Sequence, residues 1–319
     1  MIQRPKVLLT GPMNPEGERL IAELAEVVLA PDAEPATLRR LVVDAEVLVV
    51  RSALPADLLD HAPQLRGIVR HGVGVDMIPM AAANARRIPV ANVPGSNRHA
   101  VAEHAIGAVS LLRRRTAQMD TRLRQDGWDA SRALADQAGE LHEQVLGVVG
   151  VGEIGSRIAE IAHHGYGMRV LGHQRRLDAL PAFVEGVALD DMLALSDAVV
   201  LACPLTESTR GLIDARRLSL MPSHAVLVNV ARGAVVVEDA LVAALQARRI
   251  AGAALDVFDA QPLRTDHPLL ALGNVVLTPH AAGLTCESMR RMSLGTAAEV
   301  RRLLAGQMPL NVVNAAALR

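Results

Sequence analysis

Short apolar runs alternate with amphipathic segments along nearly the whole chain. In its N-terminal third, strand-like runs occur at Val7–Thr10, Val47–Arg51, Gly67–Arg70 and Pro89–Asn92, and Glu16–Ala25 has apolar residues at helical spacing. Nearly continuous apolar strands that alternate with amphipathic helices are typical of parallel sheets with helices on both faces. The pattern therefore predicts an α/β fold.

A second series of the same kind begins at Val145. Between the two series, Val101–Arg124 contains no proline and one glycine, Gly107, so we expect one long helix that crosses between domains. The last segment, Glu287–Ala305, is again helical, and its return to the first α/β series is a hypothesis from the pattern. In the second series, strands are expected near residues 145–150, 168–172, 198–202, 225–229, 251–255 and 275–278.

Length and composition limit the function classes. The 319 residues suggest two domains at about 150 residues each, and half of the residues (50%) are hydrophobic. A net charge of -1 gives no electrostatic argument for nucleic acid or an anionic membrane. The cysteines, Cys203 and Cys286, have no metal or redox spacing. With no apolar run near the ~20 residues that span a bilayer and no signal peptide, we expect a cytoplasmic protein without metal.

The segment Val148–Gly155 reads as a buried strand, a glycine turn and the start of a helix. Gly150, Gly152 and Gly155 have the spacing G-x-G-x-x-G, which allows a tight turn, close backbone approach to a pyrophosphate, and close packing of helix on strand. The helix N-terminus offers N–H groups and a partial positive charge to phosphates. The motif predicts a dinucleotide site, although similar turns also join strands to helices without binding anything.

The end of the next predicted strand indicates which dinucleotide is bound. An NAD site usually has Asp or Glu here, about 20 residues after the glycines, to bind the ribose 2′-hydroxyl. This chain has Gln174, Arg175 and Arg176 instead. Two guanidinium groups beside a neutral amide suit a 2′-phosphate, so we expect NADP(H) to be preferred, with NAD(H) as an alternative. The other interpretation of the arginines is a solvated pair on a surface loop.

Several separated motifs carry a family resemblance. They are Arg70–Asp76, Asn92–Asn97, Val101–His104, the glycine turn, Cys203–Thr206, Val228–Gly233, Leu255–Phe258 and Leu277–His280. With these motifs in this order, the chain resembles the D-isomer-specific 2-hydroxyacid dehydrogenase family over nearly its whole length, and NADP-preferring glyoxylate or hydroxypyruvate reductases within it. The joint match is far more specific than the glycine turn alone.

The resemblance implies an architecture. We expect two Rossmann-like domains with doubly wound parallel sheets and a cleft between them. Residues 1–98 and 287–319 would form a discontinuous substrate-binding domain, and residues 99–286 the dinucleotide-binding domain. The resemblance also implies a homodimer in which the helical region after Val101 contributes to the subunit contact.

Reduction of a 2-keto acid requires an acid and a cation. Arg232 suits the cation, because a guanidinium binds carboxylate and carbonyl oxygens through paired N–H groups. His280 suits the proton donor, because imidazole titrates near neutral pH. Each follows a predicted strand, at the edge where α/β sheets bind ligands. The family resemblance implies the same two roles, and it assigns the substrate carboxylate to the backbone N–H groups of Val73 and Gly74.

The resemblance also implies further contacts to the cofactor. Cys203 is interpreted as a small apolar filler near the cofactor, because no partnered base indicates a nucleophile. Besides the glycines and Gln174, Arg175 and Arg176, the expected contacts come from Glu153, Ile154, Cys203, Pro204, Thr209, Val230, Ala231, Asp256 and His280.

One position departs from the family pattern. Most members have a glutamate that pairs with the catalytic histidine, five residues after the aspartate of the Asp-Val-Phe motif, and this chain has Gln261 there. A carboxylate raises the pKa of a neighbouring imidazole, whereas an amide orients the ring without adding charge. We therefore expect His280 to protonate at a lower pH than in relatives that carry glutamate.

The chain is thus expected to be an NADPH-dependent reductase of a small 2-keto acid, with glyoxylate or hydroxypyruvate as the first candidates. A Gln–His pair also resembles the formate dehydrogenase branch of the superfamily, which keeps a formate-type dehydrogenase as an alternative. The chain length and Gln174–Arg176 stand against it. A second alternative, from another class, is a dinucleotide-sensing regulatory protein similar to a co-repressor, because fold alone does not fix function.

Overall fold

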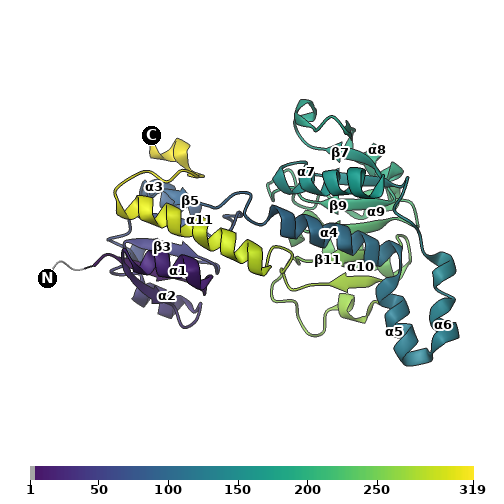
Figure 1. Ribbon diagram of the computed structural model, residues 1–319, viewed down its shortest axis with the longest axis horizontal. Helices are drawn as coiled ribbons and strands as arrows, with labels where there is room; N and C mark the ends of the chain where they lie inside the picture. Colours follow the sequence, from purple (N-terminus) through teal and green to yellow (C-terminus); the bar gives the residue numbers. More distant parts are fainter. Residues whose placement is uncertain (1–3) are drawn as a thin grey trace. The chain divides into compact units, whose positions relative to one another are not determined.

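The computed structural model describes residues 4–319, and the chain divides into two compact units (Figure 1). The first unit contains the chain up to Asn97 together with Leu284–Arg319. The second unit is Arg98–Gly283. The two boundaries lie close to the ones expected from the sequence, after residues 98 and 286. Each unit has its own parallel sheet covered by helices, as the alternating pattern predicted.

The sheet of the first unit has five parallel strands in the order β2-β1-β3-β4-β5. The predicted strands are confirmed. The edge strand β2 was not predicted, although Val27, Val28 and Leu29 form an apolar run, and its residues are exposed or partly exposed. The strands are β1 (Lys6–Leu9), β2 (Glu26–Leu29), β3 (Val47–Val50), β4 (Gly67–Arg70) and β5 (Val90–Ala91).

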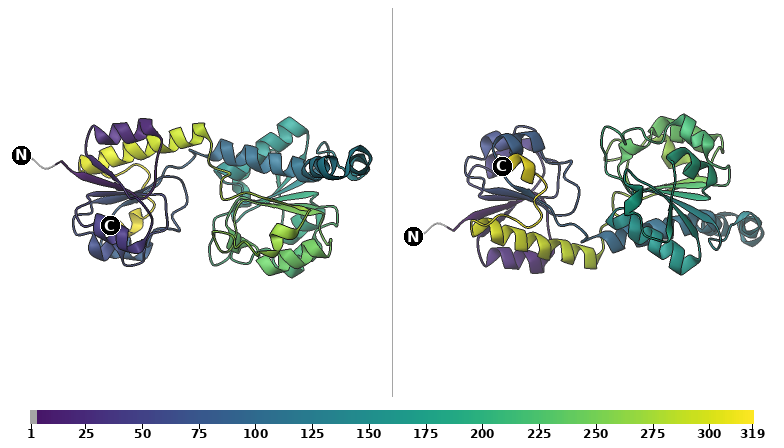
Figure 2. Two further views of the ribbon diagram at one scale, coloured as in Figure 1. Left: turned by 90° about the horizontal axis from the view of Figure 1, so that it is seen from below. Right: turned by 90° about the horizontal axis from the view of Figure 1, so that it is seen from above.

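Helices cover both faces of this sheet (Figure 2). The helices α1 (Pro15–Ala22) and α11 (Cys286–Leu304) lie on one face, where Val300 of α11 packs in one cluster with Val7 of β1. The helices α2 (Pro35–Leu41) and α3 (Met80–Ala85) lie on the other face. The C-terminal helix therefore returns to the first α/β series, which confirms the hypothesis from the sequence pattern.

The second unit has a seven-stranded parallel sheet in the order β12-β11-β10-β9-β6-β7-β8. The order reverses beside β6, whose neighbours β7 and β9 lead to opposite edges of the sheet. Such a switch point is where open α/β sheets bind ligands. The strands are β6 (Val145–Val149), β7 (Arg169–His173), β8 (Val184–Gly186), β9 (Ala198–Leu201), β10 (Val226–Asn229), β11 (Gly252–Leu255) and β12 (Val275–Leu277).

Helices also cover both faces of this sheet (Figure 2), and each face has its own hydrophobic cluster. The helices α4 (Arg98–Arg113) and α7 (Glu153–Glu160) pack in one layer. The helices α8 (Leu189–Leu195), α9 (Ala215–Leu220) and α10 (Glu238–Gln246) pack in the other. The short strand β8 had no counterpart in the sequence prediction, whereas the other strands were predicted.

The prediction of one long helix over Val101–Arg124 is wrong. The helix α4 ends at Arg113, Arg115 adopts a left-handed conformation with φ 53°, and a separate helix α5 (Thr116–Asp126) follows. The Arg113 guanidinium donates to the His224 carbonyl at 3.0 Å and to the Gln144 amide oxygen at 3.2 Å. These bonds hold the end of α4 against the body of the unit, while every residue of α5 is at least partly exposed. Tertiary contacts therefore override the local helical pattern.

A further short helix, α6 (Trp128–Arg132), packs against α5, and the Ser131 hydroxyl donates to the Met119 carbonyl at 2.8 Å. Both helices extend from the body of the second unit in Figure 1. Within residues 4–319, no helix combines the length and the apolar character that a bilayer span requires.

Candidate active site

Two of the three motif glycines are required by packing. Gly150 has φ +88°, and a Cβ atom there would lie 2.6 Å from the Cα of Cys203. A Cβ on Gly155 would lie 2.0 Å from the Gly150 carbonyl oxygen. Real Cβ atoms do not approach backbone this closely. These two glycines therefore allow β6, the turn and α7 to pack together at the switch point.

The remaining motif glycine, Gly152, is not required by packing. Gly152 is the N-cap residue of α7, and a Cβ there would meet no atom of the described residues within 4 Å. No side chain in residues 4–319 forms a cap hydrogen bond at this position. The N–H groups of a helix's first turn lack intrahelical partners, so this end of α7 presents donors and a partial positive charge to open space. The geometry fits an anionic pyrophosphate.

Beside the turn, Cys203 follows β9 and is buried. Burial raises the pKa of its thiol to about 11, so the residue is a neutral, apolar neighbour of the turn rather than a nucleophile. Thr209 closes the following loop, because its hydroxyl donates to the Pro204 carbonyl at 2.7 Å and accepts from the Thr206 N–H at 2.7 Å. The expected cofactor contacts Cys203, Pro204 and Thr209 are thus grouped at the end of β9, next to the glycine turn.

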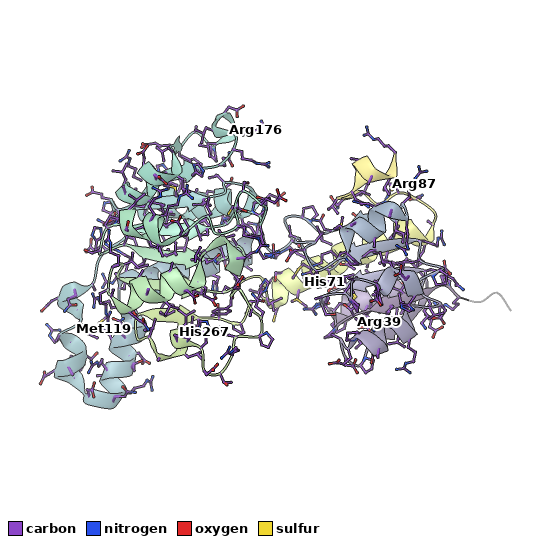
Figure 3. All side chains as sticks on the ribbon, turned by 180° about the vertical axis from the view of Figure 1, so that it is seen from behind. Arg39, His71, Arg87, Met119, Arg176 and His267 are labelled. Carbon is purple, nitrogen blue, oxygen red and sulfur yellow. The ribbon has the colours of Figure 1, made fainter. Side chains whose placement is uncertain are left out.

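The arginines expected to select NADP(H) lie on the loop after β7. The Gln174 amide donates to the Arg176 carbonyl at 2.7 Å, which folds the loop over itself. Arg175 is exposed, and Arg176 lies 3.6 Å from the Asp178 carboxylate with both side chains more than three-quarters exposed. Figure 3 shows Arg176 at the outer edge of this loop. Such an exposed ion pair is weak, so Arg176 can turn toward an anion at little cost.

Arg232 follows β10 in a turn held by a residue that sequence reasoning did not single out. Buried Asn229 accepts from the Ala231 N–H at 3.0 Å and donates to the Arg232 carbonyl at 3.0 Å. The Arg232 guanidinium, which is half-buried, donates to the Ala231 carbonyl at 2.7 Å. Asn229 therefore sets the direction in which Val230, Ala231 and Arg232 leave the strand. The available signal in the sequence was a polar residue at the end of an apolar strand, three positions before Arg232.

His280 lies beyond β12 and has a left-handed backbone, with φ 54°. Its Nδ1 lies 3.0 Å from the Oε1 of Gln261. The Gln261 Nε2 donates to the Phe258 carbonyl at 3.4 Å, so the amide oxygen faces the ring. Because an amide oxygen only accepts, Nδ1 carries a proton and Nε2 is the atom that changes protonation state. The structure thus brings together the two residues that the sequence expected to pair.

Asp256 shapes the loop that carries His280. Its carboxylate, which is buried, accepts from the Thr278 hydroxyl at 2.6 Å and from the N–H groups of Ala281 and Ala282 at 2.8 and 3.0 Å. The His280 N–H donates to the Asp256 carbonyl at 2.8 Å. Asp256 was expected to contact the cofactor, but both of its carboxylate oxygens bond to the His280 loop. This function in the loop was not apparent from the sequence.

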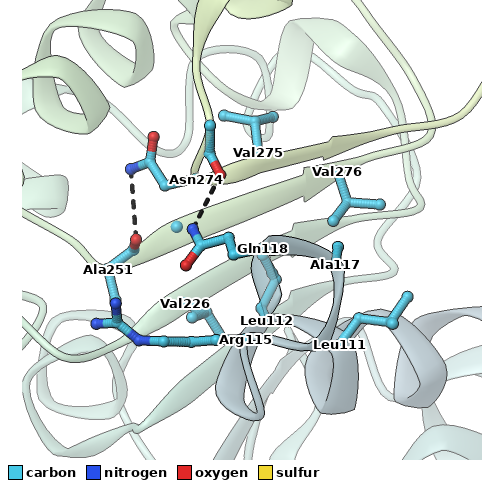
Figure 4. Close-up of a pocket in the computed structure, with 12 residues that line it drawn as sticks. Leu111, Leu112, Arg115, Ala117, Gln118, Val226, Ala251, Asn274, Val275 and Val276 are labelled. Atoms are coloured by element: carbon cyan, nitrogen blue, oxygen red, sulfur yellow. Dashed lines mark hydrogen bonds between the residues drawn. The ribbon is translucent and has the colours of Figure 1, made fainter. Parts of the chain in front are cut away.

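A pocket elsewhere in the second unit does not belong to this group. It lies between the α4–α5 bend and the amino ends of β10, β11 and β12 (Figure 4). Gln118 donates to the Gly273 carbonyl at 2.9 Å, and Asn274 donates to the Ala251 carbonyl at 3.3 Å. Gly150, Arg232 and His280 lie beyond the carboxyl ends of their strands, at the opposite edge of the same sheet. Ligands of parallel α/β sheets bind at the carboxyl edge, so the pocket is separate from the candidate active site.

The remaining predicted site residues, Val73 and Gly74, lie in the first unit on the loop after β4, and both are partly exposed. Their carbonyls are bonded by protein donors, at 2.8 Å from Asn92 to Val73 and at 2.9 Å from Arg70 to Gly74. This loop is therefore held in a defined conformation.

Comparison with known proteins identifies the family. The family model for the D-isomer specific 2-hydroxyacid dehydrogenase, NAD binding domain, matches residues 106–282. A glyoxylate reductase of Aeropyrum pernix is 36% identical over 98% of this chain and 97% of its own length. The NADPH-dependent glyoxylate/hydroxypyruvate reductase of Sinorhizobium meliloti, solved with NADP and malonate, superposes with a TM-score of 0.86 at 31% identity, covering 98% of this chain and 97% of that one.

A third relative belongs to the branch considered as an alternative. The NAD-dependent formate dehydrogenase of Staphylococcus aureus superposes with a TM-score of 0.84 at 28% identity, covering 95% of this chain and 96% of that one. The glycine turn, Arg232 and the Gln261–His280 pair lie within the part that the family model matches. The chain therefore belongs to the D-isomer-specific 2-hydroxyacid dehydrogenases, and it is an oxidoreductase that uses a nicotinamide dinucleotide.

Proposed function

We propose that the protein reduces a small 2-keto acid with NADPH, and that glyoxylate or hydroxypyruvate is its substrate. The observation that carries the proposal is the hydrogen bond between His280 and Gln261, beyond the same edge of the sheet as the glycine turn. The glyoxylate reductases among its relatives support the substrate class. Bound cofactor supplies the hydride that reaches the carbonyl carbon.

His280 supplies the proton. Negative charge develops on the carbonyl oxygen during reduction, and an imidazolium with a proton on Nε2 can both stabilise that charge and donate the proton. Gln261 keeps the ring in this orientation by accepting from Nδ1 at 3.0 Å. Asp256 supports the backbone of the same loop through its bonds to Ala281 and Ala282.

Arg232 binds and polarises the substrate. A guanidinium presents paired N–H groups that match a carboxylate or a neighbouring carbonyl oxygen. The bond from its Nη1 to the Ala231 carbonyl at 2.7 Å restricts the orientation of the group. A pre-oriented cation contributes more in a transition state than one that must reorganise, because the electrostatic interaction costs no rearrangement.

NADPH preference rests on the loop after β7. Arg175 and Arg176 would bind the 2′-phosphate, and Gln174 would contact the ribose in place of the acidic residue of NAD-preferring relatives. Both arginines are exposed, and the ion pair of Arg176 with Asp178 is a weak surface pair, so both guanidinium groups are accessible to an anion. The Sinorhizobium meliloti reductase, which is NADPH-dependent and was solved with NADP, supports the same cofactor.

We also propose a homodimer that uses the projecting helices α5 and α6. The side chains of Leu123 on α5 and Trp128 on α6 are 45% and 68% exposed. A large exposed aromatic residue on a projecting helix pair favours burial against a partner. Sedimentation or light scattering would test this, and a monomer at micromolar concentration would contradict it.

The direct test of the function is the initial rate of NADPH and of NADH oxidation with glyoxylate, hydroxypyruvate and phenylpyruvate. We expect rapid turnover with NADPH on at least one small 2-keto acid. His280→Gln should remove most turnover, because the variant has no imidazole to supply the proton. Comparable specificity constants for the two cofactors would contradict the preference for NADPH.

Formate oxidation is the second candidate, favoured by the amide partner of His280. Removing a hydride from formate produces carbon dioxide and needs no proton acceptor, so an uncharged partner is sufficient. Reduction of NADP⁺ or NAD⁺ by formate, without reduction of keto acids, would support it. A regulatory protein that senses dinucleotides would instead bind NADPH tightly and turn over none of these substrates.

A further inference from the structure

The loop after β4 has an ordered arrangement of backbone groups. Three successive carbonyls accept hydrogen bonds from protein donors. The Gly72 carbonyl accepts from the Val93 N–H at 2.9 Å, the Val73 carbonyl from the Asn92 amide at 2.8 Å, and the Gly74 carbonyl from the Arg70 Nε at 2.9 Å. Each of the three peptide planes is therefore fixed from its carbonyl side.

Fixing these carbonyls also directs the N–H groups. In a planar trans peptide the carbonyl of one residue and the N–H of the next point in opposite directions. The N–H groups of Val73, Gly74 and Val75 therefore point away from the three donors. Within residues 4–319, no acceptor is bonded to any of these N–H groups. Successive unpaired N–H groups in a turn form an anion-binding concavity, and a carboxylate has the charge and size to fill it.

The Arg70 side chain bonds to two carbonyls of this loop, whereas the Asn92 side chain bonds to one. The Arg70 guanidinium donates to the carbonyls of His71 and Gly74 within the loop, and to the Val50 carbonyl at the end of neighbouring β3 at 2.9 Å. The loop lies directly on the group, because a Cβ on Gly72, which has φ +135°, would be 3.3 Å from the Arg70 Cζ. One side chain thus joins both ends of the loop to the sheet and places a positive charge behind it.

We infer that Arg70 is a positioning residue for carboxylate recognition. It orients the Val75 N–H by holding the Gly74 carbonyl, and its charge adds to the field at the N–H groups without contacting the anion. The inference goes beyond the proposed function, on which it rests only for the substrate being a 2-keto acid. A lysine cannot reproduce this arrangement, because its ammonium is a single point while the guanidinium forks toward separated carbonyls.

The test is a titration of the 15N-labelled protein with pyruvate in the presence of saturating NADP⁺. The amide resonances of Val73, Gly74 and Val75 should shift and saturate in the wild type. In Arg70→Met the Kd for pyruvate should rise about tenfold or more, because a hydrogen bond that involves an ionic partner contributes a factor of this order. Arg70→Lys keeps the charge and should lie closer to Arg70→Met than to the wild type.

Arg302→Met is the matched control, because the Arg302 Nε donates to the Met308 carbonyl at 2.9 Å in the same unit. This variant should bind pyruvate as the wild type does. An unchanged Kd in Arg70→Met, or pyruvate that shifts none of the three amides in the wild type, would overturn the inference. A melting temperature within a few degrees of the wild type would show that Arg70→Met still folds.

Kinetics separate positioning from a general structural role. With a 2-keto acid as substrate, Arg70→Met should raise KM by the same factor as the Kd, with kcat changed by no more than about threefold and the Kd of NADPH unchanged. A lower kcat with an unchanged KM would contradict the inference. If the wild type turns over no 2-keto acid, the proposed function fails, while the titration still tests Arg70.

Discussion

The imidazole Nδ1 of His280 lies 3.0 Å from the amide oxygen of Gln261. The contact orients the ring but adds no charge to it, whereas a glutamate at the same place would add a full negative charge. Since the two residues come from different loops, 19 positions apart in the chain, their pairing is a product of the fold. Because of this pairing, one substitution at Gln261 can change the charge beside the His280 ring.

Gln261→Glu should move the pH dependence of keto-acid reduction to higher pH. Reduction needs protonated His280, so its rate falls as the pH rises through the imidazole pKa. A carboxylate beside the ring favours the imidazolium and raises that pKa by about one unit or more. The measurement is kcat/KM from pH 5 to 10 with saturating NADPH. Gln246→Glu, at an exposed position at the end of α10, is the control. An unmoved pH limb in Gln261→Glu would contradict the role of this pair.

Two alanine substitutions in the glycine turn should affect different properties, one the binding of NADPH and the other the stability of the protein. Gly152→Ala should weaken NADPH binding about tenfold or more and leave the melting temperature nearly unchanged, because its Cβ meets no described protein atom but enters the space expected for the pyrophosphate. Gly155→Ala should destabilise the protein, because its Cβ would lie 2.0 Å from the Gly150 carbonyl oxygen. Fluorescence titration and thermal denaturation measure the two effects. Equal losses of stability would refute the distinction.

Replacing Arg175 and Arg176 together with alanine should reduce the preference for NADPH over NADH about tenfold to a hundredfold. Each charge-assisted hydrogen bond to a phosphate contributes about 1.5–3 kcal/mol, and 1.4 kcal/mol corresponds to a factor of ten. The loss should fall on NADPH, with little change for NADH. The ratio of specificity constants is the measurement, and the exposed residues Arg86 and Arg87 after α3 provide the control double variant. An unchanged ratio would mean that the loop arginines are only solvated.

Asp256→Asn should lower kcat about tenfold or more. The Asp256 carboxylate accepts hydrogen bonds from the Thr278 hydroxyl and from the Ala281 and Ala282 N–H groups. In the variant, an amide NH₂ would face at least one of these donors, and that hydrogen bond would be lost. The loop of His280 should shift as a result. The Kd of NADPH should change by no more than about threefold if Asp256 acts through the loop. A loss confined to NADPH affinity would instead assign Asp256 to the cofactor. Asp239→Asn, at an exposed position in the first turn of α10, is the control.

The stability of the protein should fall as the pH drops from about 6.5 to about 4, in part through His71. Burial, together with the nearby charges of Arg51 and Arg70, lowers the pKa of His71 from 6.5 to about 4. Between pH 6.5 and 4 the unfolded chain binds a proton at this histidine and the folded chain does not. The free energy of unfolding therefore decreases as the pH falls, by as much as about 1.4 kcal/mol per pH unit. Above pH 6.5 this contribution is constant.

His71→Gln should reduce that pH dependence. The glutamine amide can still donate to the Ser293 hydroxyl, which lies 2.8 Å from the His71 Nε2, but it does not titrate. Urea denaturation at pH 4.5, 5.5 and 7 would measure the slope. His61→Gln, at an exposed position in the same unit, should retain the wild-type slope. Equal slopes in the wild type and His71→Gln would show that His71 contributes nothing to acid sensitivity.

Much of the fold followed from local pattern. Apolar runs such as Val47–Val50 and Val226–Leu227 are buried on both faces of a parallel sheet, so the sequence there is continuously hydrophobic and easily recognised. The short edge strand β8 was missed, because two of its three residues are exposed and only Val184 is apolar, whereas the apolar run of the edge strand β2 was overlooked. The break at Arg115 was also missed, because neither a proline nor a glycine marks it in the sequence.

By itself, the sequence determined which residue types stand at the ends of the strands. It placed the glycines after β6, Arg232 after β10 and His280 after β12, and the parallel α/β pattern required these ends to share one edge of the sheet. What holds those groups in place was decided by the tertiary structure. The bonds from Ala282 to Asp256 and from Arg70 to Val50 join residues 26 and 20 positions apart. Strand order and loop closure bring such partners together, and neither has a local periodicity that a sequence could display.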